Sequence, residues 1–283
     1  MKKLLTYLSI AVLFGLTLSF FAPDSDATFY RRGRLLKTGQ TTQYSSKLDD
    51  GYYQKGLAKS YTVISPGTTT LIKLAHYVSA AGAITFNNTL HTIVDSGSGL
   101  AIFKTNDVIY TDSAGNLGPF TVTTGNSVTT ITATGATFTD GTPAGTVTFY
   151  KAENHTNNVV FDNNTGLMWS QTVSGNMGAA SDGKMPWTGQ TYDIFAYAAA
   201  ANAANLGGYN DWRIANRGEI SSIINLETKL PDTTPFTGFP SAIIQTSASV
   251  DANNQFSVRF DSAATISSLL KTNDYLVLLI RGG

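Results

Sequence analysis

Histidines and carboxylates are the side chains of this chain that could bind a metal ion or carry acid–base chemistry. The histidines show no HExxH or HxH pattern and no carboxylate at ligand spacing; they are His76, His91 and His155. A carboxylate pair could hydrolyse a glycoside, but Asp49 and Asp50 lie in a polar stretch, and Glu219 is better explained as a helix cap. The sequence therefore predicts no catalytic residue, no metal site and a protein that is not an enzyme.

Nucleophilic and phosphate-binding motifs are also absent from the sequence. The chain has no cysteine, which removes disulfides, thiolate nucleophiles and cysteine-bound metals together. It has no GxSxG elbow, no Walker loop and no dinucleotide fingerprint. Residues 97–99 (GSG) lie between short β-like runs with no helix after them, so they are interpreted as a turn. No cofactor is expected.

Residues 162–166 (DNNTG) gather oxygen-bearing side chains that could attract calcium. They lack the twelve-residue spacing and the final bidentate glutamate of an EF-hand loop. An Asx turn explains the segment better. Calcium is an alternative that the spacing does not support.

The first 27 residues have the layout of a signal peptide. Lys2 and Lys3 precede an apolar run over residues 4–22, and Ser25 and Ala27 supply the small residues of a cleavage site. We therefore expect an exported chain that is periplasmic, extracellular or attached to the cell surface. The alternative is a retained membrane anchor, because the apolar run is long enough to span a bilayer.

Charge argues against a polyanionic partner. The formal net charge is zero and only 13% of residues are charged. The one basic cluster, Arg31, Arg32 and Arg34, is interpreted as a solvated tail. Binding to nucleic acid is not expected.

Three segments follow the signal peptide. Residues 28–60 form a polar lead-in without either structural period. Residues 61–151 are rich in β-branched residues, and alternating runs such as 128–132 (VTTIT) are separated by glycine-containing turns. They predict a small all-β module. Residues 152–283 form the third segment, in which strand-like runs surround two predicted helices.

The first predicted helix spans residues 191–205 and ends at Gly207 and Gly208. Its packed stripe is predicted to be Ile194, Phe195, Ala198 and Ala201. The second begins at Asn216, which can form a capping box with Glu219. Its buried face is predicted to be Ile220, Ile223, Ile224 and Leu226. Two helices between β segments predict an α+β domain.

The third segment resembles the Lcl C-terminal domain, a family of secreted bacterial proteins that is named for a collagen-like adhesin. The resemblance rests on residues 165–169 (TGLMW), 206–220 (LGGYNDWRIANRGEI) and 280–283 (IRGG), with a similar lead-in at residues 38–56. It implies a C-type-lectin-like fold, in which two helices flank a twisted antiparallel sheet and a loop-rich face binds ligand. Residues 61–151 would then be an inserted β module.

Four residues of the motif have a physical interpretation of their own. Trp169 and Trp212 can bury large apolar areas in one core corner, while Asp211 and Arg213 satisfy backbone groups or one another. The chain departs from the family at residues 244–247 (IQTS) and 275–279 (YLVLL), where members carry a Trp-Ser-Ser-like strand and an aromatic-rich strand. These departures put an inherited ligand in doubt.

The sequence thus predicts an exported recognition or adhesion protein that binds a glycan, a cell surface or another protein. If the binding face follows the family, it lies after the second helix and comprises Gln245, Thr246, Asn253, Asn254, Arg259, Lys271, Asn273, Asp274 and Tyr275. The alternative is a structural component of an oligomeric surface or phage-like assembly without a small ligand.

Overall fold

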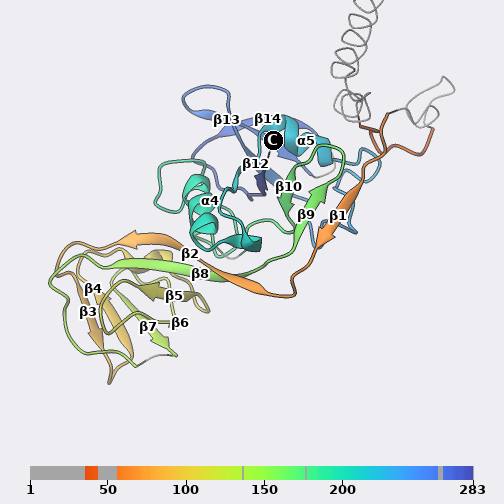
Figure 1. The fold of residues 1–283 in the computed structure, drawn as a ribbon. Helices are drawn as coiled ribbons and strands as arrows, with labels where there is room; N and C mark the ends of the chain where they lie inside the picture. Colours follow the sequence, from red (N-terminus) through yellow and green to blue (C-terminus); the bar gives the residue numbers. More distant parts are fainter. Residues whose placement is uncertain (1–35, 44–55, 136, 176, 261–263, 283) are drawn as a thin grey trace, which may run out of the picture.

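The computed structural model describes residues 36–43, 56–135, 137–175, 177–260 and 264–282 (Figure 1). The predicted signal peptide, residues 44–55 of the lead-in and Gly283 lie outside this description. Among the described residues, no helix has the length and apolar character needed to cross a membrane. The described residues fold mostly as antiparallel β-sheet with two α-helices, which agrees with the predicted α+β class.

Seven antiparallel strands form the β module, in the order β2-β8-β5-β6-β7-β4-β3. Their bounds are β2 Thr69–Val78, β3 Ile84–Asn87, β4 Thr92–Asp95, β5 Val108–Thr111, β6 Phe120–Thr124, β7 Thr130–Thr134 and β8 Thr148–Thr156, with a short 3₁₀ helix, η1, at Leu100–Ile102. Inward side chains alternate with outward threonines, as in β7, where Ile131 and Ala133 are buried. The module has its own apolar core, built mainly from Phe86, Phe103, Phe120, Phe138 and Phe149.

The module begins later along the chain than the sequence pattern predicts. Strand β1 (Tyr61–Ile64) pairs with β9 (Val159–Asp162), and Ile64 lies opposite Val159. The chain then leaves along the long β2–β8 ribbon and returns beside its point of departure (Figure 1). Tyr61 therefore belongs to the sheet of the C-terminal domain, because strand pairing across the inserted module decides its place.

The C-terminal domain is built on a five-stranded sheet, in the order β1-β9-β10-β15-β11. Its remaining strands are β10 (Met168–Ser170), β11 (Arg213–Ile214) and β15 (Leu279–Arg281). A separate three-stranded sheet comprises β12 (Ile243–Ser249), β13 (Asn254–Arg259) and β14 (Ile266–Leu270).

Helix α4 (Ile194–Ala203) lies inside the predicted helical range. The Asp193 side chain caps it by accepting the backbone N–H groups of Phe195 and Ala196. Ile194, Ala198 and Ala201 are buried as predicted, but Phe195 is 43% exposed. Asn205 adopts the left-handed conformation (φ 52°) just after the helix, and a short 3₁₀ turn, η2 (Leu206–Gly208), follows. The first left-handed residue after the helix is therefore Asn205, which precedes the predicted Gly207.

Helix α5 (Arg217–Ile223) begins with the predicted capping box between Asn216 and Glu219. Ile220, Ile223 and Ile224 are buried. Leu226 was expected on the same face but is 46% exposed, because the helix ends at Ile223 and the chain turns away before Leu226.

Two apolar cores lie on opposite faces of the five-stranded sheet. Neighbouring residues along each strand alternate between them: Val159 and Met168 enter the core that holds α4, while Val160 and Trp169 enter the core that holds α5. Trp212 belongs to the α4 core. Both predicted tryptophans are therefore buried, but they do not share one corner as the sequence analysis expected.

Candidate functional site

The charged residues of the DWR segment (residues 211–213) are paired with partners outside it. Asp211 accepts from the Arg281 guanidinium at 2.5 and 3.1 Å, and those hydrogen bonds hold the pKa of Asp211 below its ordinary value. Arg213 donates to both carboxylate oxygens of Glu219, at 2.9 and 2.7 Å. Of the two predicted alternatives, the backbone one holds for Arg213, which also donates to the Gly282 carbonyl at 3.0 Å, and the two side chains are not paired with each other.

Trp212 has a structural position in the α4 core. It is 3% exposed, and its indole Nε1–H donates to the Leu206 carbonyl at 2.8 Å. The Asn202 amide binds the Trp212 backbone N–H and carbonyl at 2.6 and 2.8 Å. These contacts fix the segment against α4, which agrees with its predicted role in the core.

The predicted binding face is partly covered by other segments. Gln245 and Thr246 are fully buried. The Gln245 amide donates to the Met185 and Tyr275 carbonyls, and the Thr246 hydroxyl donates to the Phe256 carbonyl at 2.7 Å. Their polar atoms are thus used within the fold. We correct the prediction at both positions: neither faces solvent, because residues 185–187 contact both, through the Met185 carbonyl on Gln245 and the Trp187 indole N–H on the Thr246 carbonyl.

Lys271 is also withdrawn from solvent, with 9% exposure. Its ammonium donates to the Asp251 carbonyl at 2.8 Å and to the Ala252 carbonyl at 3.3 Å, and it lies 4.3 Å from the centre of the Trp187 ring. It joins two loops, and this structural role was not predicted.

The other residues of the predicted face are accessible. Asn253, Asn273 and Asp274 are exposed, and the rest are half-buried: Asn254, Arg259 and Tyr275. The Asn254 amide donates to the Asp251 carboxylate at 2.9 and 3.1 Å, and the Asn273 amide donates to the Tyr275 hydroxyl at 3.2 Å. Asn253 and Asn254 lie close to residues 271–275, whereas Arg259 lies at the other end of β13, so the structure does not bring all the predicted residues together.

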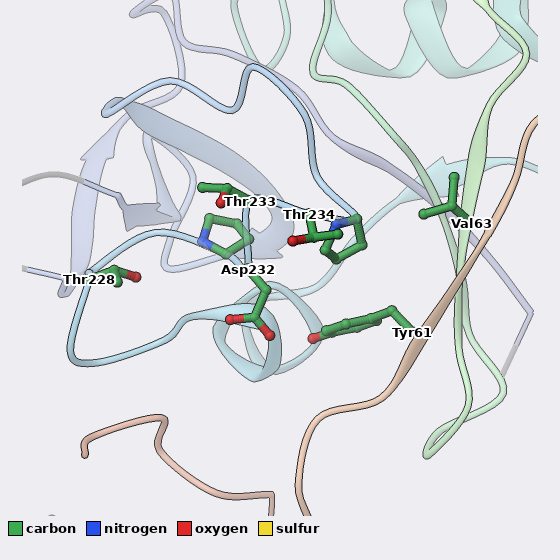
Figure 2. A pocket seen from close by; sticks show the side chains of 8 residues that line it. Tyr61, Val63, Thr228, Asp232, Thr233 and Thr234 are labelled. Carbon is green, nitrogen blue, oxygen red and sulfur yellow. The ribbon is translucent and has the colours of Figure 1, made fainter.

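A deeper site lies between β1 and the loop after α5. We call it the Tyr61 pocket, and its volume is about 420 Å³. Figure 2 shows the Tyr61 hydroxyl and the Asp232 carboxylate directed toward each other. The pocket is lined by Tyr61, Val63, Thr228, Pro231, Asp232, Thr233, Thr234 and Pro235.

Backbone pairing and aromatic packing hold Tyr61 at the pocket. It lies opposite Asp162 in the β1–β9 ladder, so both side chains are on the sheet face that carries the α5 core. Its ring packs edge-on against Phe236, with ring centres 5.5 Å apart. On the other wall, the Asn225 amide donates to the Asp232 carboxylate at 3.2 Å.

Two polar atoms of the paired strands β1 and β9 are buried without a hydrogen-bond partner among the described residues: the Tyr61 hydroxyl, whose residue lines the pocket, and Oδ2 of Asp162, which lies opposite Tyr61. The other Asp162 oxygen, Oδ1, accepts the Asn164 N–H at 2.9 Å, which confirms the predicted Asx turn. Buried polar atoms usually have a partner, because leaving one unpaired costs about 1–3 kcal/mol. The unpartnered Tyr61 hydroxyl in the pocket wall makes this pocket the strongest candidate site.

Lys59 supplies a positive charge near the two aspartates. Its ammonium donates to the Ile224 carbonyl. Burial lowers the pKa of Lys59 to about 8, while attraction to Asp232 and Asp162 opposes that shift. Burial, followed by the charges of Asp162 and Asp232, raises the pKa of Tyr61 well above its ordinary value. Tyr61 therefore keeps its proton at neutral pH and can donate a hydrogen bond.

The chemistry of the pocket is that of hydrogen bonding to a polar ligand. It offers a carboxylate acceptor, a tyrosine donor and threonine hydroxyls that can do either. No group of three or more metal-ligating side chains lies in the described parts of the chain. Sequence reasoning missed the pocket because it placed Tyr61 in the β module. The nearest local signal in the sequence is the PDTTP run at residues 231–235, which forms part of the pocket lining.

A second hollow, of about 440 Å³, lies beside α4 and includes Phe195, Ala198 and Trp212. Much of its polar chemistry is already used. The Asn202 amide is bound to the Trp212 backbone and the Arg213 guanidinium to Glu219. It is therefore a weaker candidate than the Tyr61 pocket.

Comparison with known proteins assigns one part of the chain to a family. The chain matches no curated protein. The family description "Lcl C-terminal domain" matches residues 158–281, a range that contains β9 and ends in β15. Strand β1 and the β module lie before the matched range. Residues 158–281 of this chain therefore form an Lcl C-terminal domain.

Proposed function

We propose that this chain is an exported, non-enzymatic recognition or adhesion protein whose Tyr61 pocket binds a hydroxyl-rich group, such as a sugar residue of a surface glycan. The observation that carries the proposal is the buried, unpartnered Tyr61 hydroxyl in the wall of a pocket of hydroxyl and carboxylate groups. We also propose that the C-terminal domain has a C-type-lectin-like arrangement, with its two helices on opposite faces of the five-stranded sheet.

The lining of the pocket suits a sugar hydroxyl group better than an ion. An approaching hydroxyl can accept from the Tyr61 O–H and donate to the Asp232 carboxylate, which point toward one another (Figure 2). Val63, Pro231 and Pro235 give apolar surface against which the C–H side of a sugar ring can pack. The volume lies within the roughly 300–1,000 Å³ range of small-ligand pockets.

A glycan array probed with the mature chain tests this function. Tyr61→Phe removes one hydroxyl while keeping the ring that packs on Phe236, so the fold should be retained. Losing a hydrogen bond to the ligand should weaken glycan binding by about tenfold, corresponding to about 1.4 kcal/mol. Thr234→Val should also weaken glycan binding, because it removes a hydroxyl group from the pocket while the side-chain volume stays nearly constant.

Thr129→Val is the matched control, because Thr129 is an exposed threonine of the β module and lies outside the Tyr61 pocket. It should leave every array signal unchanged. Silence of the wild-type chain on all glycans, or equal signals from Tyr61→Phe and wild type, would count against the proposal.

A second function, a structural role in an oligomeric assembly, is favoured by β14. This strand ends the order β12-β13-β14 among the described strands, and its Ile266 and Leu270 are 48% and 50% exposed. An apolar edge strand can pair with another chain. Light scattering on the mature chain measures its oligomeric state and so tests this role. A stable wild-type trimer that becomes monomeric in Leu270→Lys would support the role, and a monomeric wild-type chain would contradict it.

A further inference from the structure

A buried lysine–aspartate pair lies where the β module meets the C-terminal domain. Lys151 is in β8, and Asp107 comes just before the neighbouring strand β5, in which Ile109 is opposite Lys151. Lys151 Nζ is 2.8 Å from Asp107 Oδ2, and the two side chains are only 2% and 5% exposed. Such close contact away from water is uncommon for oppositely charged side chains, whose desolvation is costly.

Ser181 of the C-terminal domain completes a closed ring with this pair. Lys151 Nζ donates to Ser181 Oγ at 3.0 Å, and Ser181 Oγ donates to Asp107 Oδ1 at 2.5 Å. Ser181 has a φ of 57°, a left-handed conformation that is uncommon outside glycine. The hydroxyl therefore provides a continuous path for a proton from the lysine nitrogen to the aspartate oxygen.

Two backbone carbonyls orient the lysine nitrogen. Nζ donates to the Gly178 carbonyl at 3.1 Å and to the Ala179 carbonyl at 3.3 Å. Buried charges tend to neutralise one another by proton transfer. Once one proton has passed to Asp107, the two remaining N–H groups can bind these carbonyls, and the nitrogen keeps a lone pair with which it can attack the adjacent carboxyl group.

We propose that Lys151 and Asp107 become joined by an isopeptide bond that the protein forms itself. The Ser181 hydroxyl relays one proton from the ammonium to Oδ1, and Nζ then attacks Cγ. A second proton leaves Nζ for Oδ1, the Cγ–Oδ1 bond breaks and Oδ1 departs as water. One N–C bond forms, one C–O bond breaks and one water is released, so no oxidant, reductant or co-reactant is needed.

The surroundings favour the condensed product. The cavity of about 270 Å³ that borders Lys151, Asp107 and Ser181 gives the released water a way out. The chain has no cysteine with which to form a disulfide, so this bond would be a covalent link between strands that does not depend on thiols.

Trypsin digestion of the denatured wild-type chain, followed by mass spectrometry, tests the proposal. Trypsin does not cleave after an acylated lysine, and residues 105–150 contain no lysine or arginine. We expect a fragment spanning residues 105–184, lighter than its sequence mass by about 18 Da, the mass of one water. Separate fragments 105–151 and 152–184 of full sequence mass would overturn the proposal.

Two variants make the result specific. Lys151→Arg keeps the positive charge and the trypsin site but cannot form this bond, so it should yield fragment 105–151 without mass loss. Ser181→Ala keeps Lys151 and Asp107 but removes the relay, so the uncleaved fragment should become a minor species. A mass loss of about 18 Da with normal cleavage after Lys151 would mean an aspartyl succinimide, and it too would overturn the proposal.

Discussion

At the scale of single residues, burial separates the motif residues that hold the fold from those that could meet a ligand. Trp169 and Trp212 are apolar core residues on opposite faces of one sheet, whereas Tyr61 and Asp232 line a pocket. Gln245 and Thr246 look like ligand-binding residues in the sequence, yet both are buried under contacts with Met185 and Trp187. A polar side chain in a strand gives no local sign of which distant segment will lie over it, so that error could not be avoided from the sequence.

Trp212→Ala should destabilise the domain by about 3–5 kcal/mol, because it leaves a large cavity in the α4 core. It also removes the indole hydrogen bond to Leu206. Phe195→Ala is the control, since that aromatic ring is 43% exposed and its loss should cost far less. Melting temperature and urea unfolding measure both variants. A Trp212→Ala chain of normal stability would contradict the core assignment.

His76 should make stability depend on pH. Its ring is buried, stacks on the Tyr192 ring and lies near the charges of Lys151 and Asp107. Its Nδ1 atom is 2.8 Å from the Leu74 carbonyl oxygen, and its Nε2 atom is 2.6 Å from the Met177 carbonyl oxygen. Burial lowers the pKa of His76 to about 4, although the two carbonyls oppose the shift. Between that value and the ordinary value of about 6.5, the unfolded chain binds a proton that the folded chain does not.

The neutral His76 ring therefore adds to the free energy of unfolding by its full amount above about pH 6.5. This stabilisation, up to about 3 kcal/mol, is lost as the pH falls toward about 4. Urea unfolding at several pH values measures it. His76→Gln should flatten the stability profile over this pH interval, after allowance for the other titrating groups. An unchanged slope in His76→Gln would show that another group is responsible.

At the scale of elements, features encoded by neighbouring residues were predicted well and features set by distant pairing were not. The capping box of α5 and the Asx turn after β9 each need only a few consecutive residues, and both are present. Strand β1 was placed in the wrong sheet, because its partner β9 follows only after the whole inserted module. The Tyr61 pocket was missed for the same reason, since its two walls come from β1 and from the loop after α5.

Asn216→Ala should destabilise the C-terminal domain by about 1 kcal/mol, because it removes the side-chain acceptor for the Glu219 N–H at the start of α5. Ser221→Ala is a suitable control: its hydroxyl bonds only to the Arg217 carbonyl within the helix. Thermal unfolding of the two variants gives the comparison. Equal stabilities would mean that tertiary packing alone fixes the start of α5.

At the scale of the whole molecule, the β module is more than a loop insertion. Ile72 and Leu74 of β2 are almost fully buried in the core that also contains α4, although both precede the range of the Lcl C-terminal domain. The buried Lys151–Asp107 pair is bound by Ser181 of that domain. Module and domain therefore share both an apolar core and a polar network.

Because of this shared core, calorimetry should show a single cooperative unfolding transition in which the β module and the C-terminal domain unfold together. Ile72→Ala should lower its midpoint, at a cost of about 2–5 kcal/mol, because it empties space beneath α4. Val94→Ala, at a 37% exposed position of the module, is the control and should change little. Two separate transitions, with only one affected by Ile72→Ala, would contradict a shared core.

A crystal structure of residues 28–283 with the glycan that binds most tightly on the array will show where the ligand lies. We predict a sugar residue in the Tyr61 pocket, with one hydroxyl between the Tyr61 hydroxyl and the Asp232 carboxylate. A glycan held only by the exposed loops around Asn253 and Asn273, with an empty Tyr61 pocket, would contradict this prediction.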